Sequence, residues 1–135
     1  MLAARTDEVV VARNRLREII QKRALVLAEP EKEFVLASGE RSRFYFNMKK
    51  VTMERDAGQL IVTCVLPLLP VGVDQVGGLE TGAVPIIEAL VLHPSGPRHG
   101  FFVRKQEKQH GLKEKIEGNF DPGKTSVIVD DVTTT

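Results

Sequence analysis

Asp130 and Asp131 follow directly on an apolar run in the segment Ser126-Val-Ile-Val-Asp-Asp-Val-Thr-Thr-Thr135. A short apolar run of this kind is typical of a buried strand in a parallel sheet. Open α/β sheets bind their ligands outside the carboxyl ends of the strands. Carboxylates that accept sugar hydroxyls, followed by threonine hydroxyls and amide N–H groups that bind a phosphate, predict a phosphorylated-sugar site at this edge. The alternative is an aspartate that only caps the following helix.

The composition indicates an ordinary globular chain without a polyanionic partner. Its 135 residues suffice for one domain, and 42% hydrophobic with 27% charged residues is typical of a soluble protein. The net charge of only +1 argues against nucleic-acid binding. A single cysteine, Cys64, leaves no internal disulfide framework and favours a reducing, cytoplasmic location. No apolar run approaches membrane-spanning length, so we expect no membrane partner.

Periodicity and breaker residues predict alternating strands and helices. The predicted helices cover residues 6–27, 56–68 and 84–92. The predicted strands cover 34–36 and 44–47, which form a hairpin around Ser38-Gly39, and then 73–76, 100–104 and 125–129. A glycine-rich turn over 77–82 opens the third helix, and a long polar loop covers 105–123. This order predicts right-handed βαβ units in a doubly wound α/β domain with a mainly parallel sheet.

Three segments resemble one family. The motif Val129-Asp-Asp-Val-Thr-Thr-Thr135 is similar to the phosphoribosyl diphosphate (PRPP) motif of type I phosphoribosyltransferases. The segments Phe34-Val-Leu-Ala-Ser-Gly-Glu-Arg-Ser-Arg-Phe-Tyr-Phe-Asn47 and Phe101-Phe-Val-Arg-Lys-Gln-Glu-Lys-Gln-His-Gly111, the latter followed by Ile116-Glu-Gly118, narrow the resemblance to orotate phosphoribosyltransferases. The resemblance covers nearly the whole chain.

The resemblance implies a type I phosphoribosyltransferase-like fold in one structural domain. Residues 1–53 are expected to form an N-terminal helix and a hood hairpin, and residues 54–135 the PRPP-binding α/β core. Members of the family continue beyond the threonines with glycine and further sheet. We therefore expect this chain to be C-terminally truncated relative to the family, with an incomplete core.

The implied reaction transfers the phosphoribosyl group of PRPP to orotate, giving orotidine 5′-monophosphate and pyrophosphate in de novo pyrimidine (UMP) biosynthesis. Positive charge grows on the ribose and negative charge on the leaving group, so the reaction needs positioning and electrostatic stabilisation more than a nucleophile. The expected cofactor is Mg²⁺ held mainly by substrate oxygens, with no metal ligand from the protein.

The resemblance also implies the roles of individual residues. Those expected to bind PRPP are Arg104, Lys105, Lys108, His110, Asp130, Asp131, Val132, Thr133, Thr134 and Thr135. Those expected to act in catalysis are Lys108, Asp130 and Asp131. Those expected to bind orotate are Tyr45, Phe46 and Thr134, although packing within the hairpin is an equal alternative for the two aromatic residues. For Phe44 we expect packing in the core.

The implied partners are the substrates orotate and PRPP and a second copy of the chain, in a homodimer whose active sites are shared through the 104–118 loop. Two departures affect the site, because many family members carry a lysine where this chain has Ala37 and a tyrosine-lysine pair where it has Thr81-Gly82. The amides of residues 80–83 at a helix N-terminus offer a compensating anion site. The alternative functions are a non-catalytic PRPP- or nucleotide-binding regulator, a purine or uracil phosphoribosyltransferase, and an inactive truncated form.

Overall fold

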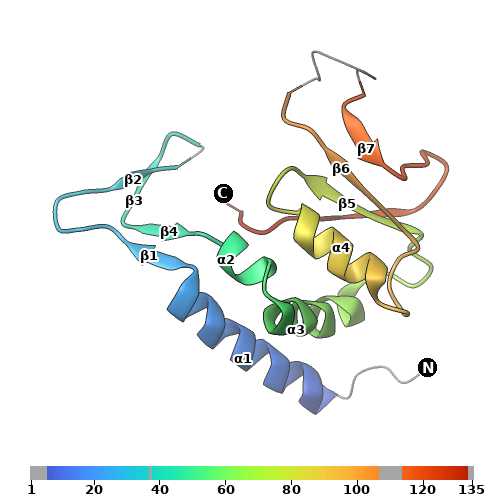
Figure 1. Cartoon of the computed structure of the whole chain (residues 1–135), viewed down its shortest axis with the longest axis horizontal. Coiled ribbons are helices and arrows are strands. Elements are labelled where there is room, and N and C mark those ends of the chain that lie inside the picture. The colour runs from blue at the N-terminus through green and yellow to red at the C-terminus, as the bar shows by residue number, and fades with distance from the viewer. Residues whose placement is uncertain (1–5, 37, 107–113, 134–135) are drawn as a thin grey trace.

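The computed structural model describes residues 6–36, 38–106 and 114–133 (Figure 1). In these residues a four-stranded sheet packs against helices, and an arm of short antiparallel strands extends to one side. We call residues 25–46, which carry these short strands, the N-terminal arm. No helix in the described ranges is long and apolar enough to cross a membrane.

The first helix is shorter than predicted. It forms α1 (Thr6–Arg23), and the chain then enters β1 (Leu25–Leu27). β1 pairs antiparallel with β4 (Phe44–Phe46), with Leu25 opposite Phe46. The prediction of helix through residue 27 is therefore wrong, because the apolar residues that fit its helical pattern are used in a strand ladder.

The predicted single hairpin consists of two separate ladders. β2 (Phe34–Val35) pairs with β3 (Arg41–Ser42) around Gly39, whose φ of 86° suits a residue without a side chain. The pairing of 34–36 with 44–47 is therefore wrong. After β3 the chain continues to β4, which completes the ladder with β1 at the base of the N-terminal arm (Figure 1).

The predicted helices over 56–68 and 84–92 are confirmed within a residue or two. The first is α3 (Arg55–Val65) with a 3₁₀ turn, η1 (Leu66–Leu68), and the second is α4 (Val84–Leu92). The short helix α2 (Lys49–Thr52) precedes α3. α1 packs on α3, α3 on α4, and α4 on the sheet. The buried residues of this main core are Ile61, Val62, Val76, Ala83, Ile86, Ile87 and Leu90.

The sheet is mainly parallel, as predicted. Its order is β7-β6-β5-β8, and β5 (Gln75–Leu79), β6 (His99–Val103) and β8 (Ser126–Val129) are parallel. The predicted loop over 105–123 contains a strand, β7 (Ile116–Gly118), which pairs antiparallel with β6. The polar composition of the segment concealed this short strand at the edge of the sheet.

The glycine pair at 77 and 78 lies inside β5, so the prediction that it forms a turn is wrong. A Cβ at Gly77 would overlap the ring of Phe101. A Cβ at Gly78 would overlap Ala83 Cβ and the carbonyl oxygen of Val129. These glycines therefore serve close packing against the neighbouring strands and the start of α4, and they do not terminate the strand.

Candidate functional site

The carboxyl ends of three parallel strands meet at one edge of the sheet. β5 lies between β6 and β8, so the chain moves first to one side of β5 and then to the other. Such a reversal opens a crevice beside the central strand, here between β5 and β8. The residues that follow these strands are 80–83, 104–106 and 130–133, and we call them together the sheet edge.

The two predicted carboxylates differ in their surroundings. Asp130 is exposed, whereas Asp131 is half-buried and its N–H donates to Asp130 Oδ1 over 2.9 Å. Asp131 lies across the crevice against Gly82, where a Cβ would overlap its carboxylate. Gly82 is thus the residue that lets the loop after β5 and the loop after β8 touch.

Burial raises the pKa of Asp131 above its ordinary value of 3.8. The hydrogen bond with the Asp130 side chain and the negative charge of Asp130 raise it further, while the charge of Lys49 lowers it. Two adjacent carboxylates that repel each other favour a ligand that supplies hydroxyl donors or positive charge. Lys49 is exposed, yet its charge acts on Asp131.

Arg104 and Lys105, at the end of β6, are held by their backbones. The Arg104 N–H donates to the Lys115 carbonyl over 2.9 Å, and the Lys105 N–H donates to Glu80 Oε1 over 2.9 Å. The Arg104 guanidinium forms an ion pair with Glu117 of β7, with Nη1 3.4 Å from Oε1. Its Nε is buried and has no hydrogen-bond partner in the described part of the chain. Sequence reasoning missed both glutamates, because their pairing depends on strands that lie side by side only in the fold.

The loop between β5 and α4 offers fewer amides for an anion than its sequence predicts. The Glu80 N–H donates to the Val103 carbonyl (3.0 Å), and the Ala83 N–H to the Leu79 carbonyl (3.3 Å). Within the described ranges, the N–H groups of Thr81 and Gly82 form no hydrogen bond. Among the described residues these two amides are therefore unpaired beside Asp131, where Thr81 is exposed and Gly82 is buried.

The aromatic residues of β4 lie on the N-terminal arm and are solvent-accessible. Phe44, Tyr45 and Phe46 are 56%, 43% and 41% exposed. The prediction that Phe44 packs in the core is wrong, because a two-stranded ladder has no second layer to cover it. Tyr45 contacts Phe34, with ring centroids 5.6 Å apart. Both Tyr45 and Phe46 retain surface that a flat ligand could cover.

The chain segment after the N-terminal arm reaches the sheet edge. A cavity of about 290 Å³ is lined by Asp130 and Asp131 together with Met48 and Thr52, which flank and end α2. The Thr52 hydroxyl is buried and has no hydrogen-bond partner among the described residues. The arm and the carboxylate pair are thus connected through α2, and the structure brings Arg104, Lys105, Asp130, Asp131, Val132 and Thr133 to the edge itself. The other predicted residues, Ala37, Lys108, His110, Thr134 and Thr135, lie outside the described residues.

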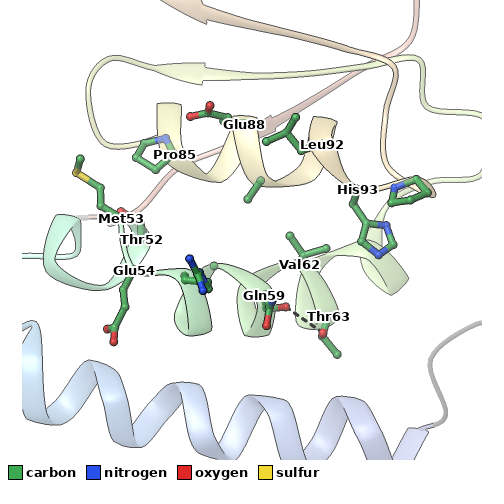
Figure 2. Close-up of a pocket in the computed structure, with 14 residues that line it drawn as sticks. Thr52, Met53, Glu54, Gln59, Val62, Thr63, Pro85, Glu88, Leu92 and His93 are labelled. Atoms are coloured by element: carbon green, nitrogen blue, oxygen red, sulfur yellow. Dashed lines mark hydrogen bonds between the residues drawn. The ribbon is translucent and has the colours of Figure 1, made fainter.

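A larger groove, of about 910 Å³, lies between α3 and α4 and contains none of the predicted site residues (Figure 2). Gln59, Val62 and Thr63 line it from α3, and Pro85 and Leu92 line it from α4. Met53 and Leu92 at its rim are 74% and 75% exposed. Among the described residues no group of three or more His, Cys, Asp or Glu side chains could hold a metal ion.

Comparison with known proteins identifies close relatives of the chain. The orotate phosphoribosyltransferase of Aquifex aeolicus is 37% identical over 131 residues, which cover 94% of this chain and 71% of the relative. That of Bradyrhizobium sp. strain BTAi1 is 41% identical over 135 residues, covering 92% of this chain and 69% of the relative. No protein-family model matches the chain.

Solved structures agree with these relatives. The orotate phosphoribosyltransferase of Mycobacterium tuberculosis H37Rv, in complex with Fe(III) dicitrate, superposes with a TM-score of 0.71 at 30% identity, covering 92% of this chain and 69% of that one. The same enzyme in complex with PRPP superposes with a TM-score of 0.68 at 28% identity, covering 92% and 67%.

Proposed function

Because the chain belongs to the orotate phosphoribosyltransferase family, we propose that its sheet edge is the site where the phosphoribosyl group of PRPP is transferred to orotate. Enzymes of this family are glycosyltransferases of pyrimidine biosynthesis, and the reaction releases orotidine 5′-monophosphate and pyrophosphate. The observation that carries the proposal is the contact of Asp131 with Gly82 across the β5–β8 crevice. This contact places the Asp130 and Asp131 carboxylates, which suit ribose hydroxyls, beside the N–H groups of Thr81 and Gly82, which are unpaired in the described part of the chain and suit a phosphate.

In this proposal Asp130 and Asp131 accept hydrogen bonds from the 2′ and 3′ hydroxyls of the ribose. Their mutual repulsion, which raises the pKa of Asp131, is relieved by these donors. It is relieved further as positive charge grows on the ribose ring, so the pair stabilises the transition state more than the ground state. Val132, Thr133, Thr134 and Thr135 bind the 5′-phosphate through amides and hydroxyls.

Pyrophosphate is proposed to lie between the loop after β5 and the loop after β6. The N–H groups of Thr81 and Gly82 face it from one side, and Arg104 and Lys105 supply positive charge from the other. Arg104 Nη1 is engaged by Glu117, so the guanidinium is oriented before any ligand arrives. Lys108 and His110 extend this cationic segment, with Lys108 acting as charge accumulates on the leaving group.

Orotate is proposed to bind against Tyr45 and Phe46 of the N-terminal arm, with Thr134 nearby. The exposed ring surface of β4 supports this, because a flat base gains from stacking on an aromatic side chain. In this proposal residues 1–53 comprise the N-terminal helix and the hood, and residues 54–135 form the PRPP-binding core.

Mg²⁺ is the proposed cofactor. We propose that the ion is held mainly by substrate oxygens and water, which Mg²⁺ commonly keeps as ligands, and that the protein supplies no ligand of its own. When bound, the ion neutralises negative charge on the pyrophosphate leaving group. The two carboxylates are the residues that would orient a metal–PRPP complex.

We further propose a cytoplasmic location, which the place of the family in pyrimidine biosynthesis supports, and a homodimer. The groove between α3 and α4, with Met53 and Leu92 exposed at its rim, supports self-association because exposed apolar surface favours burial against another chain (Figure 2). If the 104–118 loop serves the partner's site, mixing Lys108→Ala with Asp131→Asn should restore about one quarter of the wild-type activity by random exchange of subunits. Light scattering measures the molecular mass of the mixture and so establishes whether it is a dimer. If the dimer is confirmed and the mixed variants recover no activity, the active sites are not shared between subunits.

The proposed activity is tested by following the loss of orotate absorbance with PRPP and Mg²⁺. The wild-type chain should consume orotate, and Lys108→Ala should be slower by about a hundredfold or more, because its charge acts mainly in the transition state. Lys124→Ala, which removes an exposed lysine remote from the sheet edge, is the matched control and should retain activity. Absence of turnover in the wild-type chain contradicts the proposed function, whereas full activity of Lys108→Ala contradicts only the role of that lysine.

A further inference from the structure

Glu80 lies where the two proposed pyrophosphate-binding loops begin, and its backbone extends the sheet by one hydrogen bond. The parallel ladder of β5 and β6 ends at the pair Leu79 and Val103. The Glu80 N–H then donates to the Val103 carbonyl over 3.0 Å. Beyond this bond the backbone of β5 turns into α4, so it offers no further carbonyl to the continuation of β6.

The side chain of Glu80 takes the place of that carbonyl. The Lys105 N–H donates to Glu80 Oε1 over 2.9 Å, while the preceding N–H, of Arg104, donates to the Lys115 carbonyl over 2.9 Å. Successive amides of an extended chain point to opposite sides, so the two bonds hold the chain from both sides. The start of the cationic loop is thereby tied to the loop after β5 as well as to the segment leading into β7.

Charge alone does not explain a carboxylate at this position. Glu80 lies beside amides that are proposed to bind pyrophosphate, and a negative side chain there repels a negative ligand. This repulsion is offset if the Glu80 carboxylate accepts the hydrogen bond of the Lys105 N–H, since a hydrogen bond to a charged acceptor is stronger than one between neutral groups.

We propose that Glu80 is a positioning residue for phosphoribosyl transfer. Its carboxylate fixes the backbone at Lys105 and so sets the direction from which Arg104 and Lys105 approach the pyrophosphate of PRPP. The inference rests on the proposed function, because pyrophosphate is the ligand that those two side chains are proposed to bind.

The test compares Glu80→Ala with Glu80→Gln in the full chain. Both remove the charge, but only glutamine keeps an oxygen that can accept the Lys105 N–H. Positioning predicts that Glu80→Ala weakens PRPP binding in calorimetry and lowers kcat/KM by about tenfold, mostly through KM for PRPP, as expected for one lost hydrogen bond to a charged group. Glu80→Gln should stay within about twofold of wild type. Glu18→Ala, which removes an exposed carboxylate from α1, is the control for charge and should leave KM for PRPP unchanged.

Amide hydrogen exchange at Lys105, measured without ligand, gives a reading that does not depend on activity. The amide should exchange about tenfold faster or more in Glu80→Ala and clearly less fast in Glu80→Gln, which keeps a neutral acceptor. Equal or tighter PRPP binding by both variants overturns the inference, because that result is expected if Glu80 acts only through its charge. Unchanged exchange in Glu80→Ala also overturns it. A wild-type chain that does not bind PRPP contradicts the proposed function instead. In that case the exchange rates still decide whether the Glu80 side chain holds the Lys105 amide.

Discussion

The sheet edge and the N-terminal arm are held by different kinds of contact. At the sheet edge the backbones of β5, β6 and β8 are fixed in register, and Gly78 and Gly82 are covered so closely that neither position has room for a side chain. In the arm, two short ladders leave Phe44, Tyr45 and Phe46 largely uncovered. The proposed ribose-binding half of the site is therefore built from closely packed strands, whereas the proposed base-binding half is an open surface.

This difference has a physical origin. A parallel strand with neighbours on both sides is positioned by hydrogen bonds along two edges and by packing on α4. A two-stranded ladder has one hydrogen-bonded edge and is only marginally stable by itself. Substitutions in the two regions should thus differ in what they change, with stability lost at the sheet edge and binding lost in the arm.

The largest effect is expected from Gly78→Ala, which tests how closely β5 is packed where it leads into the sheet edge. Its Cβ would overlap Ala83 Cβ and the Val129 carbonyl oxygen, so β5 and β8 would have to separate. We expect the free energy of unfolding to fall by about 3 kcal/mol, the upper range for overpacking a core. Urea unfolding measures it. Gly58→Ala on α3 is the control, because no atom outside the local helix backbone lies within 4 Å of its added Cβ. It should be neutral or stabilising, since alanine favours helix, and equal midpoints for the two variants would contradict the close packing.

Asp131→Asn separates function from stability at the same edge. Loss of a charged acceptor for a ribose hydroxyl should lower PRPP-dependent turnover by about ten- to a hundredfold. The melting temperature at pH 7 should not fall, because the half-buried carboxylate is costly when ionised. A large fall in melting temperature would instead indicate that Asp131 mainly caps a helix.

The pH dependence of this variant follows from the raised pKa of Asp131. A raised pKa means that the folded state favours the neutral carboxyl, so this contribution to stability is complete below the ordinary aspartate pKa. It is lost as the pH rises through the raised, folded-state pKa. Asparagine cannot ionise, so the melting temperature of Asp131→Asn relative to wild type should increase over that range and stay constant above it. A difference that decreases with rising pH would contradict the assigned direction.

Tyr45→Ala tests the open surface of the N-terminal arm. We expect KM for orotate to rise about fivefold, corresponding to loss of one stacking contact of about 1 kcal/mol. The melting temperature should change little, because Tyr45 is only partly covered. Tyr45→Phe keeps the ring and should keep the wild-type KM. If Tyr45→Ala instead destabilises the chain without changing KM, the residue serves packing with Phe34.

The smallest effect is expected from Leu27→Thr on β1. Leu27 is exposed and threonine retains strand propensity, so the free energy of unfolding should change by no more than about 0.5 kcal/mol. Chemical denaturation and light scattering together measure it. A shift from dimer to monomer would show that another chain covers the N-terminal arm. That result would contradict the description of the arm as an open surface.

The local pattern of apolar residues was sufficient to predict those helices and strands whose formation depends on one continuous segment of the chain. The apolar run before Asp130 predicted β8, and the segment Val84–Leu92 predicted α4 with the correct bounds. The family resemblance was carried by short motifs, and the sequence relatives and solved structures confirm it. The prediction of a turn at Gly77 and Gly78 was wrong. Glycine is common in turns and also in strands that another chain segment approaches closely, so its presence alone does not distinguish the two.

The sequence by itself thus determined the α/β class, the family, and the segments that gather at the sheet edge, since these depend on local periodicity and on motifs contiguous in the chain. Only the tertiary structure decided that Leu25–Leu27 is a strand, that Ile116–Gly118 closes the sheet, and that Glu80, Glu117 and Lys49 act on Lys105, Arg104 and Asp131. The reason is that a strand needs its partner, and a charge its neighbour, and both come from positions distant in the chain.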